Sequence, residues 1–169
     1  MNLSDSRSIA APIDVVWAAL LDAEVLKACV PGCQEMSGTP ETGFEATVVQ
    51  KVGPVKATFK GAVTLSDIDA PNSVTISGEG KGGAAGFAKG GADVRLEAQD
   101  GGTLLHYDVE AKVGGKLAQL GSRIIDGFAK KMADQFFSNF QQAVEGPDAE
   151  TAEDGTEEKK GWFKKLVRS

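Results

Sequence analysis

The feature that most constrains the fold is a regular alternation of apolar and polar residues through the middle of the chain. In residues 55–65 the odd-numbered positions are apolar or small and the even-numbered positions are mainly polar. The same pattern runs through residues 44–52, 92–98 and 104–113. A period of two is typical of strands with one buried face, and such strands usually pair in antiparallel sheets. The sequence therefore predicts several antiparallel strands with one face turned to a core.

Shorter elements are predicted before and between these strands. Residues 3–10 form a first strand, and residues 73–77 form another strand after a turn at Pro71. Pro12 suits the first position of a helix. The helical spacing of the apolar residues that follow predicts that this helix continues to Leu21. A second short helix is expected over residues 23–28, before Pro31.

After the strands the periodicity becomes helical. Apolar residues recur at steps of three and four from about residue 115 to residue 144; they are Leu117, Leu120, Ile124, Phe128, Met132, Phe136 and Phe140. About 30 helical residues give a length of about 45 Å. A sheet must bury its apolar face, and this helix is the cover that the sequence offers. We therefore expect an α+β fold in which a curved antiparallel sheet wraps around a long C-terminal helix.

Glycine is concentrated between two of the predicted strands. Seven of the fourteen residues from Gly78 to Gly91 are glycine, and glycine inside a sheet marks a bend, a bulge or a close approach. Residues 78–83 match the GxGxxG pattern of dinucleotide-binding loops. That loop must open a helix, whereas an alternating strand pattern follows here. The glycines therefore predict a curved hairpin and not a nucleotide site.

A cavity under the long helix is the first candidate site. Alternation turns small residues toward the helix: Ala46, Ala57, Gly61, Gly78, Ala88, Gly90, Ala92 and Ala111. Opposite them, large helix residues would leave an elongated apolar space of the kind that binds ligands. The alternative is that small residues let the helix pack closely and its rings fill the gap. The expected lining residues are Trp17, Val48, Gln50, Phe59, Val63, Ile76, Phe87, Tyr107, Leu120, Ile124, Phe128, Met132 and Phe136, with Gln50 and Tyr107 as polar groups.

The residues that could carry catalysis or bind a metal are few. His106 is the only histidine, and alternation places it on the outer face with Asp108 and Glu110. No serine or cysteine has an obvious base partner. Cys29 and Cys33 lack CxxC spacing, and with one histidine they cannot form an ordinary zinc site. We therefore expect no catalytic residue and no metal site, and two reduced cysteines in a cytosolic protein.

The charge pattern divides the chain into three parts. The net charge is −6, yet residues 145–158 carry seven acidic and no basic residues, and residues 159–169 carry five basic and no acidic ones. We expect a domain over residues 1–144, a disordered acidic linker over 145–158 and a basic amphipathic tail helix over 159–169. Such asymmetry indicates a functional tail and not a nucleic-acid-binding core.

The tail combines an apolar face with flanking cations. Its apolar residues are Trp162, Phe163, Leu166 and Val167, and its basic ones are Lys159, Lys160, Lys164, Lys165 and Arg168. This pattern is typical of a helix at a membrane surface. Each cation contributes at most about 1 kcal/mol near anionic lipid, and ordering the peptide costs several kcal/mol, so weak, reversible attachment is expected. A docking peptide for a protein groove and an inert tail are the alternatives. We expect neither a secretory signal nor a membrane span.

Five segments together resemble one known family. They are APIDVVWA at 11–18, VPGC at 30–33, KVGPVKATFKG at 51–61, GFAKGGADVRL at 86–96 and GGKLAQLGSR at 114–123. The chain is similar over residues 1–144 to the carbon monoxide dehydrogenase G-subunit family of the START-like (SRPBCC) superfamily. The resemblance implies a helix-grip fold with a hydrophobic ligand between sheet and helix. It also implies an accessory role beside molybdenum hydroxylases of the carbon monoxide dehydrogenase type, at the membrane and its quinone pool.

The expected function joins this resemblance to the tail. We expect a non-catalytic accessory protein that binds a quinone or other lipid, with no covalent cofactor and no nucleic acid. Its partners would be a molybdenum hydroxylase and, peripherally, the inner face of the cytoplasmic membrane. One alternative is a START-like enzyme of the cyclase or hydrolase type acting on a small hydrophobic substrate. The other is a recruitment or assembly factor without a ligand.

Overall fold

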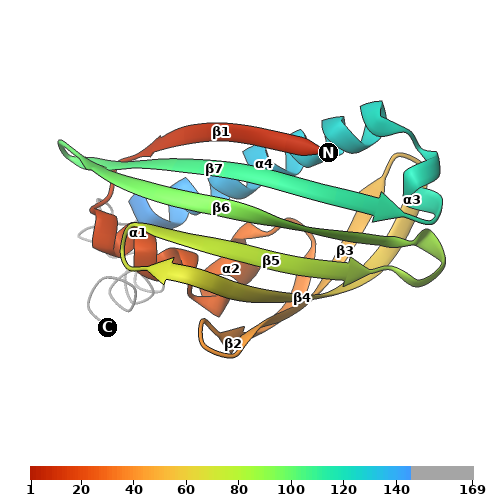
Figure 1. The fold of residues 1–169 in the computed structure, drawn as a ribbon, viewed down its shortest axis with the longest axis horizontal. Coiled ribbons are helices and arrows are strands. Elements are labelled where there is room, and N and C mark those ends of the chain that lie inside the picture. The colour runs from red at the N-terminus through yellow and green to blue at the C-terminus, as the bar shows by residue number, and fades with distance from the viewer. Residues whose placement is uncertain (146–169) are drawn as a thin grey trace, which may run out of the picture.

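A computed structural model describes residues 1–145 of the chain; the predicted tail, and the linker beyond Glu145, lie outside the described residues. One curved sheet encloses two short helices and a long C-terminal helix (Figure 1). The elements in chain order are β1 (Asn2–Ile9), α1 (Ile13–Leu20), α2 (Ala23–Cys29), β2 (Cys33–Thr39), β3 (Gly43–Val52), β4 (Val55–Asp69), β5 (Ser73–Lys81), a 3-10 turn η1 (Gly83–Ala85), β6 (Phe87–Gln99), β7 (Gly102–Gly114), α3 (Lys116–Gln119) and α4 (Ser122–Glu145).

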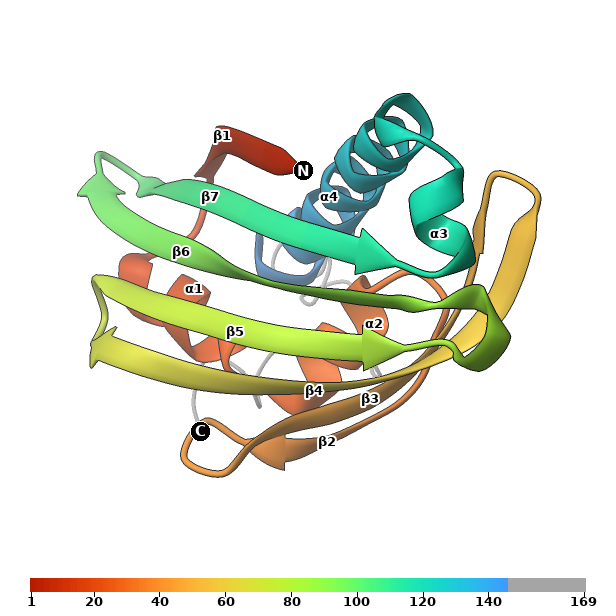
Figure 2. The same cartoon turned by 45° about the vertical axis from the view of Figure 1, so that its right-hand side comes forward.

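The sheet has the order β1-β7-β6-β5-β4-β3-β2, and all neighbouring strands are antiparallel. From β2 to β7 each strand pairs with the next along the chain, whereas β1 pairs with β7 at the far edge. The α1–α2 segment therefore connects the two edges of the sheet across its concave side. Figure 2 shows the sheet curving around α4. This is the helix-grip arrangement that the order of elements predicts.

The predicted inner face of the sheet is confirmed by burial. Phe44, Val74, Val94, Leu105 and Tyr107 are all buried, and each occupies an inward position of the alternation. Their neighbours along the strands are exposed or half-buried. The period-two pattern is therefore a direct consequence of one face of the sheet packing against helices.

The helices cover this face through two separate apolar clusters. The larger one joins α1, α2 and the C-terminal half of α4 to the sheet, with Val16, Val25 and Phe140 fully buried. The smaller one joins α3 and the start of α4 to the β3–β4 hairpin through Val52, Leu117 and Ile125. The inner-face row Ala46, Gly61, Gly80 and Ala88, which is aligned by strand register, is only half-buried.

The long helix is interrupted, which corrects the prediction of one helix over residues 115–144. The chain forms the short helix α3, turns at Gly121 and then begins α4 at Ser122. Gly121 has φ +89°, a left-handed conformation that residues with a side chain rarely adopt and that ends helices. The helical spacing of apolar residues continues across this break, which is why periodicity alone did not reveal it.

The glycine-rich segment forms the β5–β6 hairpin, and most of its glycines lie in the paired strands. Gly78 in β5 is directly opposite Gly90 in β6, and only residues 82–86 form the turn. The glycines permit close approach. A Cβ at Gly82 would lie 2.5 Å from the ring of Phe59, and a Cβ at Gly90 would lie 2.7 Å from the Cα of Ala111. Close packing therefore explains the glycine at position 90 in β6 and the one at position 82 in the turn.

Strand β2 is missing from the sequence-based prediction. Met36 is its only large apolar residue, and the strand lies at an edge of the sheet. The α2 helix that precedes it begins as predicted, because the Asp22 carboxylate accepts hydrogen bonds from the backbone N–H of Glu24 at 2.8 Å and of Val25 at 3.3 Å.

Candidate ligand-binding cavity

An apolar cavity of about 290 Å³ lies between the inner face of the sheet and the helices. Strand residues such as Val63, Ile76 and Leu105 form one wall, and Ala133 and Phe136 of α4 form the other. The two short helices and β2 close its side through Leu20, Leu26 and Met36. Large apolar side chains from both layers therefore line the space, which is partly open to solvent.

Tyr107 provides the one hydrogen-bonding side chain among the residues that line this cavity. The residue is 3% exposed, and its ring stacks on Phe137 with centroids 4.7 Å apart. Within residues 1–145 the Tyr107 hydroxyl has no hydrogen-bond partner. Every side-chain oxygen or nitrogen that is fully buried in this part of the chain does have a partner. The hydroxyl therefore retains some accessible surface, and Tyr107 is one of the residues that line the cavity.

The structure brings four of the predicted lining residues to this cavity: Val63, Ile76, Tyr107 and Phe136. Trp17 instead packs at the border of the larger apolar cluster. Phe59, Leu120 and Phe128 pack in the smaller cluster at the α3 end. Val48 and Met132 are half-buried outside the lining of the cavity.

Two predicted lining residues, Phe87 and Ile124, lie on the surface and are each 41% exposed. Phe87 occupies an outward position of β6 beside Gly114, where a Cβ would lie 2.3 Å from the Phe87 ring. Ile124 faces outward because α4 begins anew after the break at Gly121, and its rotation about the helix axis turns Ile125 toward the core instead.

Gln50, which was predicted as a polar group of the cavity, does not line it and instead holds two segments of the chain together. Its Nε2 donates a hydrogen bond to the backbone carbonyl of Pro31, which ties β3 to the loop after α2. Among the small inward residues, only Ala92 borders the cavity. The small residues therefore do not create this space, contrary to the sequence-based prediction.

The lining residues that sequence reasoning missed have two origins. Some, such as Leu65, occupy inward positions of predicted strands but were not assigned to a site. Others come from elements whose position depends on the fold: Leu26 and Val30 belong to the α2 region and Met36 to the unpredicted β2, whereas Phe137 was not on the predicted apolar face of the helix. A lone methionine in a polar segment was the one available signal for β2. Nothing local to α2 shows which side of it meets the cavity.

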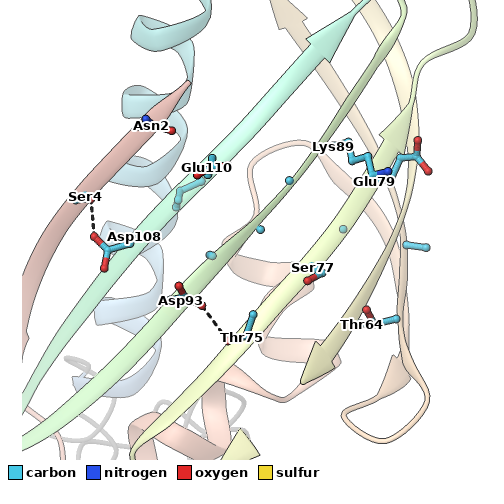
Figure 3. A pocket seen from close by; sticks show the side chains of 16 residues that line it. Asn2, Ser4, Thr64, Thr75, Ser77, Glu79, Lys89, Asp93, Asp108 and Glu110 are labelled. Carbon is cyan, nitrogen blue, oxygen red and sulfur yellow. Dashed lines mark hydrogen bonds between the residues drawn. The ribbon is translucent and has the colours of Figure 1, made fainter. Parts of the chain in front are cut away.

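A second hollow, wide and open, lies on the outer face of the sheet and has a volume of about 840 Å³ (Figure 3). Its floor consists of small residues such as Ser77 and Gly91. Two of its carboxylates already accept hydrogen bonds: Ser4 Oγ donates to Asp108 Oδ1 at 2.5 Å, and Thr75 Oγ1 donates to Asp93 Oδ1 at 2.9 Å. These contacts are those of a solvated polar surface.

His106 lies on this outer face, as alternation predicts, with its Nε2 2.5 Å from Glu97 Oε2. This hydrogen bond lowers the pKa of the Glu97 carboxyl. Neither residue borders the apolar cavity. Within residues 1–145, no three His, Cys, Asp or Glu side chains are grouped so as to hold a metal ion.

The fold and the apolar cavity between sheet and helix define a START-like protein of the helix-grip class. A solved structure of a conserved protein from Geobacillus kaustophilus has 29% sequence identity and a TM-score of 0.78, and the match covers 84% of this chain and 93% of that one. A Rhizobium leguminosarum protein has 17% identity and a TM-score of 0.64, with coverage of 83% and 91%. A Thermus thermophilus protein has 13% identity and a TM-score of 0.64, with coverage of 84% and 95%. The last two show a shared fold alone.

The family model of the carbon monoxide dehydrogenase G-subunit (CoxG) matches residues 6–145. The chain therefore belongs to the CoxG family. A search of the curated proteins returns no match. In the part of the chain that the structure describes, no helix is both long enough and apolar enough to cross a bilayer.

Proposed function

We propose that this protein is a non-catalytic accessory protein that binds a quinone or another lipid in the apolar cavity. It links a molybdenum hydroxylase of the carbon monoxide dehydrogenase type to the membrane. The observation that carries the proposal is the apolar cavity between sheet and helices, lined by a single hydrogen-bonding side chain, Tyr107. Membership of the CoxG family supports the accessory role and the class of partner.

The cavity suits a hydrophobic ring with a polar substituent. Its volume of about 290 Å³ is at the lower end of the ~300–1,000 Å³ typical of ligand pockets, so it accommodates a head group more readily than a long chain. The Tyr107 hydroxyl would donate a hydrogen bond to a carbonyl oxygen of the ligand. The neighbouring rings of Phe136 and Phe137, 5.0 Å apart, offer an aromatic surface.

The lining favours binding over catalysis. General acid–base chemistry needs a positioned proton donor or acceptor beside the reacting atom, usually oriented by a second group. Tyr107 is the only titratable residue that lines the cavity, and no charged side chain borders it. These observations weigh against the alternative of a cyclase or hydrolase.

The proposed membrane contact is the tail at residues 159–169, on the inner face of the cytoplasmic membrane. Its support is the sequence pattern of four apolar residues among five cations. The tail lies outside the described residues. A groove on the hydroxylase remains the alternative docking site for the same peptide.

Ligand binding can be tested with decylubiquinone as the probe and Ala133→Leu as a variant that fills the cavity. Ala133 lines the cavity, whereas Ala18 is exposed on α1, so Ala18→Leu is the matched control. We expect wild type and Ala18→Leu to bind the probe and Ala133→Leu to lose binding. Tyr107→Phe should bind about fivefold more weakly, because a neutral hydrogen bond contributes about 1 kcal/mol.

Mass spectrometry of solvent extracts from the natively purified chain provides the second measurement. A quinone or lipid should be extracted from wild type and be depleted in Ala133→Leu. Absence of any extracted lipid, together with no binding of added decylubiquinone, would overturn the carrier proposal and favour a ligand-free recruitment factor.

A further inference from the structure

Lysines stand directly opposite lysines at three places in the sheet. In each case the strand register aligns the two residues and both side chains are exposed. Like charges directly opposite each other destabilise an antiparallel pair, and only Lys89 also faces an acidic residue across the sheet, Glu79. For the other five lysines the stability of the sheet gives no reason for this arrangement. The pairs are Lys51 with Lys56, Lys60 with Lys81, and Lys89 with Lys112.

These pairs gather toward one end of the molecule. The β3–β4 hairpin, the β5–β6 turn and α3 meet there, as Figure 2 shows on its right-hand side. Lys116 of α3 and Arg123 at the start of α4 are exposed at the same end. Glu79 lies within this group, directly opposite Lys89, whereas Glu110 and Asp126 are exposed acidic residues at its border. We call this surface the basic end; it comprises Lys51, Lys56, Lys60, Lys81, Lys89, Lys112, Lys116 and Arg123.

The opposite end carries negative charge. Asp67 and Asp69 precede the β4–β5 turn, and Asp100 lies in the β6–β7 turn. The C-terminus of α4, with Glu145, is also at that end (Figure 1). The balance of charge therefore differs between the two ends of the long axis, and the basic end is the one that attracts anions.

Exposed apolar side chains accompany the lysines. Among residues 1–145 three large hydrophobic side chains are exposed, and two of them, Phe87 and Ile124, lie at the basic end. Phe87 is directly opposite Lys81 in the sheet. Apolar groups surrounded by lysines are typical of surfaces that enter the interface of a bilayer.

The composition of the basic end favours a bilayer over a protein surface. Protein interfaces are enriched in arginine and depleted in lysine, yet all but one of these residues are lysine. Lysine is a flexible point charge that does not need the paired geometry of a guanidinium contact. Such charges suit the diffuse negative potential of anionic lipids.

We propose that the basic end is a contact surface for an anionic phospholipid bilayer, with Phe87 and Ile124 entering the interface. This inference rests on the membrane contact of the proposed function, and it adds a contact within the folded domain that requires neither the tail nor a bound ligand. It also orients the protein, with the basic end toward the membrane and the half-buried inner-face row of Ala46, Gly61 and Gly80 between that end and the cavity.

The test is sedimentation of the full chain with vesicles of phosphatidylcholine alone and with 30% phosphatidylglycerol at low salt. The variant is Lys60→Gln with Lys81→Gln, which removes a repulsive pair and should fold normally. The control is Lys27→Gln with Lys131→Gln, which removes the same charge from exposed sites on α2 and α4. Each lysine near anionic lipid changes the partition coefficient about fivefold, so we expect a fall of up to about 25-fold for the double variant and little change for the control.

A second variant, Phe87→Ser, tests the apolar contribution, and it should weaken the part of the binding that persists at high salt. Equal binding of wild type and Lys60→Gln/Lys81→Gln would overturn the inference while leaving a membrane contact through the tail intact. Equal losses in variant and control would also overturn it, because net charge would then explain the binding. No binding of wild type to anionic vesicles would overturn this surface and the membrane part of the proposed function, whereas the cavity is tested separately with decylubiquinone.

Discussion

The two cysteine thiols differ in their surroundings. Cys29 at the end of α2 is 1% exposed, and this burial raises the pKa of its thiol to about 12. Cys33 in β2 is half-buried, and its Sγ donates a hydrogen bond to the Glu35 carbonyl at 3.2 Å. Desolvation also raises the pKa of the Cys33 thiol, and the contact with the Glu35 carbonyl and the nearby charge of Lys27 oppose this rise in part. Neither thiol has the lowered pKa of a reactive nucleophile.

Alkylation should therefore separate the two thiols. With iodoacetamide at pH 8 we expect slow modification of Cys33 and none of Cys29 in the native protein, because the accessible thiolate is the nucleophile. Peptide mass spectrometry measures both sites, and the urea-unfolded chain, in which both react, is the control. Modification of Cys29 at the rate of Cys33 would contradict the burial described for α2.

The same burial predicts a dependence of stability on pH. The folded-state pKa of Cys29 lies above the ordinary value of 9.0, so its contribution is complete below pH 9 and is lost as the pH rises toward 12. Urea unfolding of wild type should show a steeper loss of stability over this interval than Cys29→Ala.

Among the elements, the α3–α4 break depends on one backbone conformation. Gly121 has φ +89°, and a Cβ built there would meet no atom within 4 Å. Gly127 lies inside α4, and a Cβ there would also meet open space. The two glycines therefore differ in backbone conformation and not in available space.

Alanine substitution at these two positions should have opposite effects. Gly121→Ala should destabilise the protein by about 1–2 kcal/mol, since the left-handed conformation is unfavourable with a side chain. Gly127→Ala should stabilise it by about 0.4–1 kcal/mol, because alanine loses less backbone entropy in a helix. Urea denaturation measures both changes; the same sign for both variants would show that Gly121 does not end a helix.

The elements show where local pattern is informative. Alternation and helical spacing predicted β1, β3–β7, α1 and α2, because each presents one face to the core. Strand β2 could not be predicted in this way, since an edge strand with Met36 alone has no alternating signal. The helix break at Gly121 was also missed, because apolar spacing continues on both sides of it.

In the whole molecule, the two apolar clusters are expected to differ in stability. The larger cluster unites α1, α2, α4 and the sheet, with Phe140 0% exposed. The smaller cluster holds α3 and the first turns of α4 through few buried residues, among them Leu117 at 3% exposure. A region with few buried apolar contacts opens at lower free energy than the global transition.

Two substitutions that shorten a buried side chain to alanine distinguish these clusters. Phe140→Ala should lower the global unfolding free energy by about 3–5 kcal/mol. Leu117→Ala should mainly increase hydrogen exchange in residues 114–128, with a smaller effect on global stability. Hydrogen exchange resolved by peptide, with urea denaturation, compares them; uniform loss of protection in Leu117→Ala would indicate one cooperative unit.

The sequence by itself determined the fold class and the inward face of the sheet, because periodicity depends only on which side of an element meets the core. Of the thirteen predicted lining residues, four border the cavity: Val63, Ile76, Tyr107 and Phe136. Only the tertiary structure decided where along that face the cavity lies, since its position depends on where α1, α2 and α4 rest on the sheet. It also decided that the lysines of separate strands meet at one end, because strand register is a property of the assembled sheet.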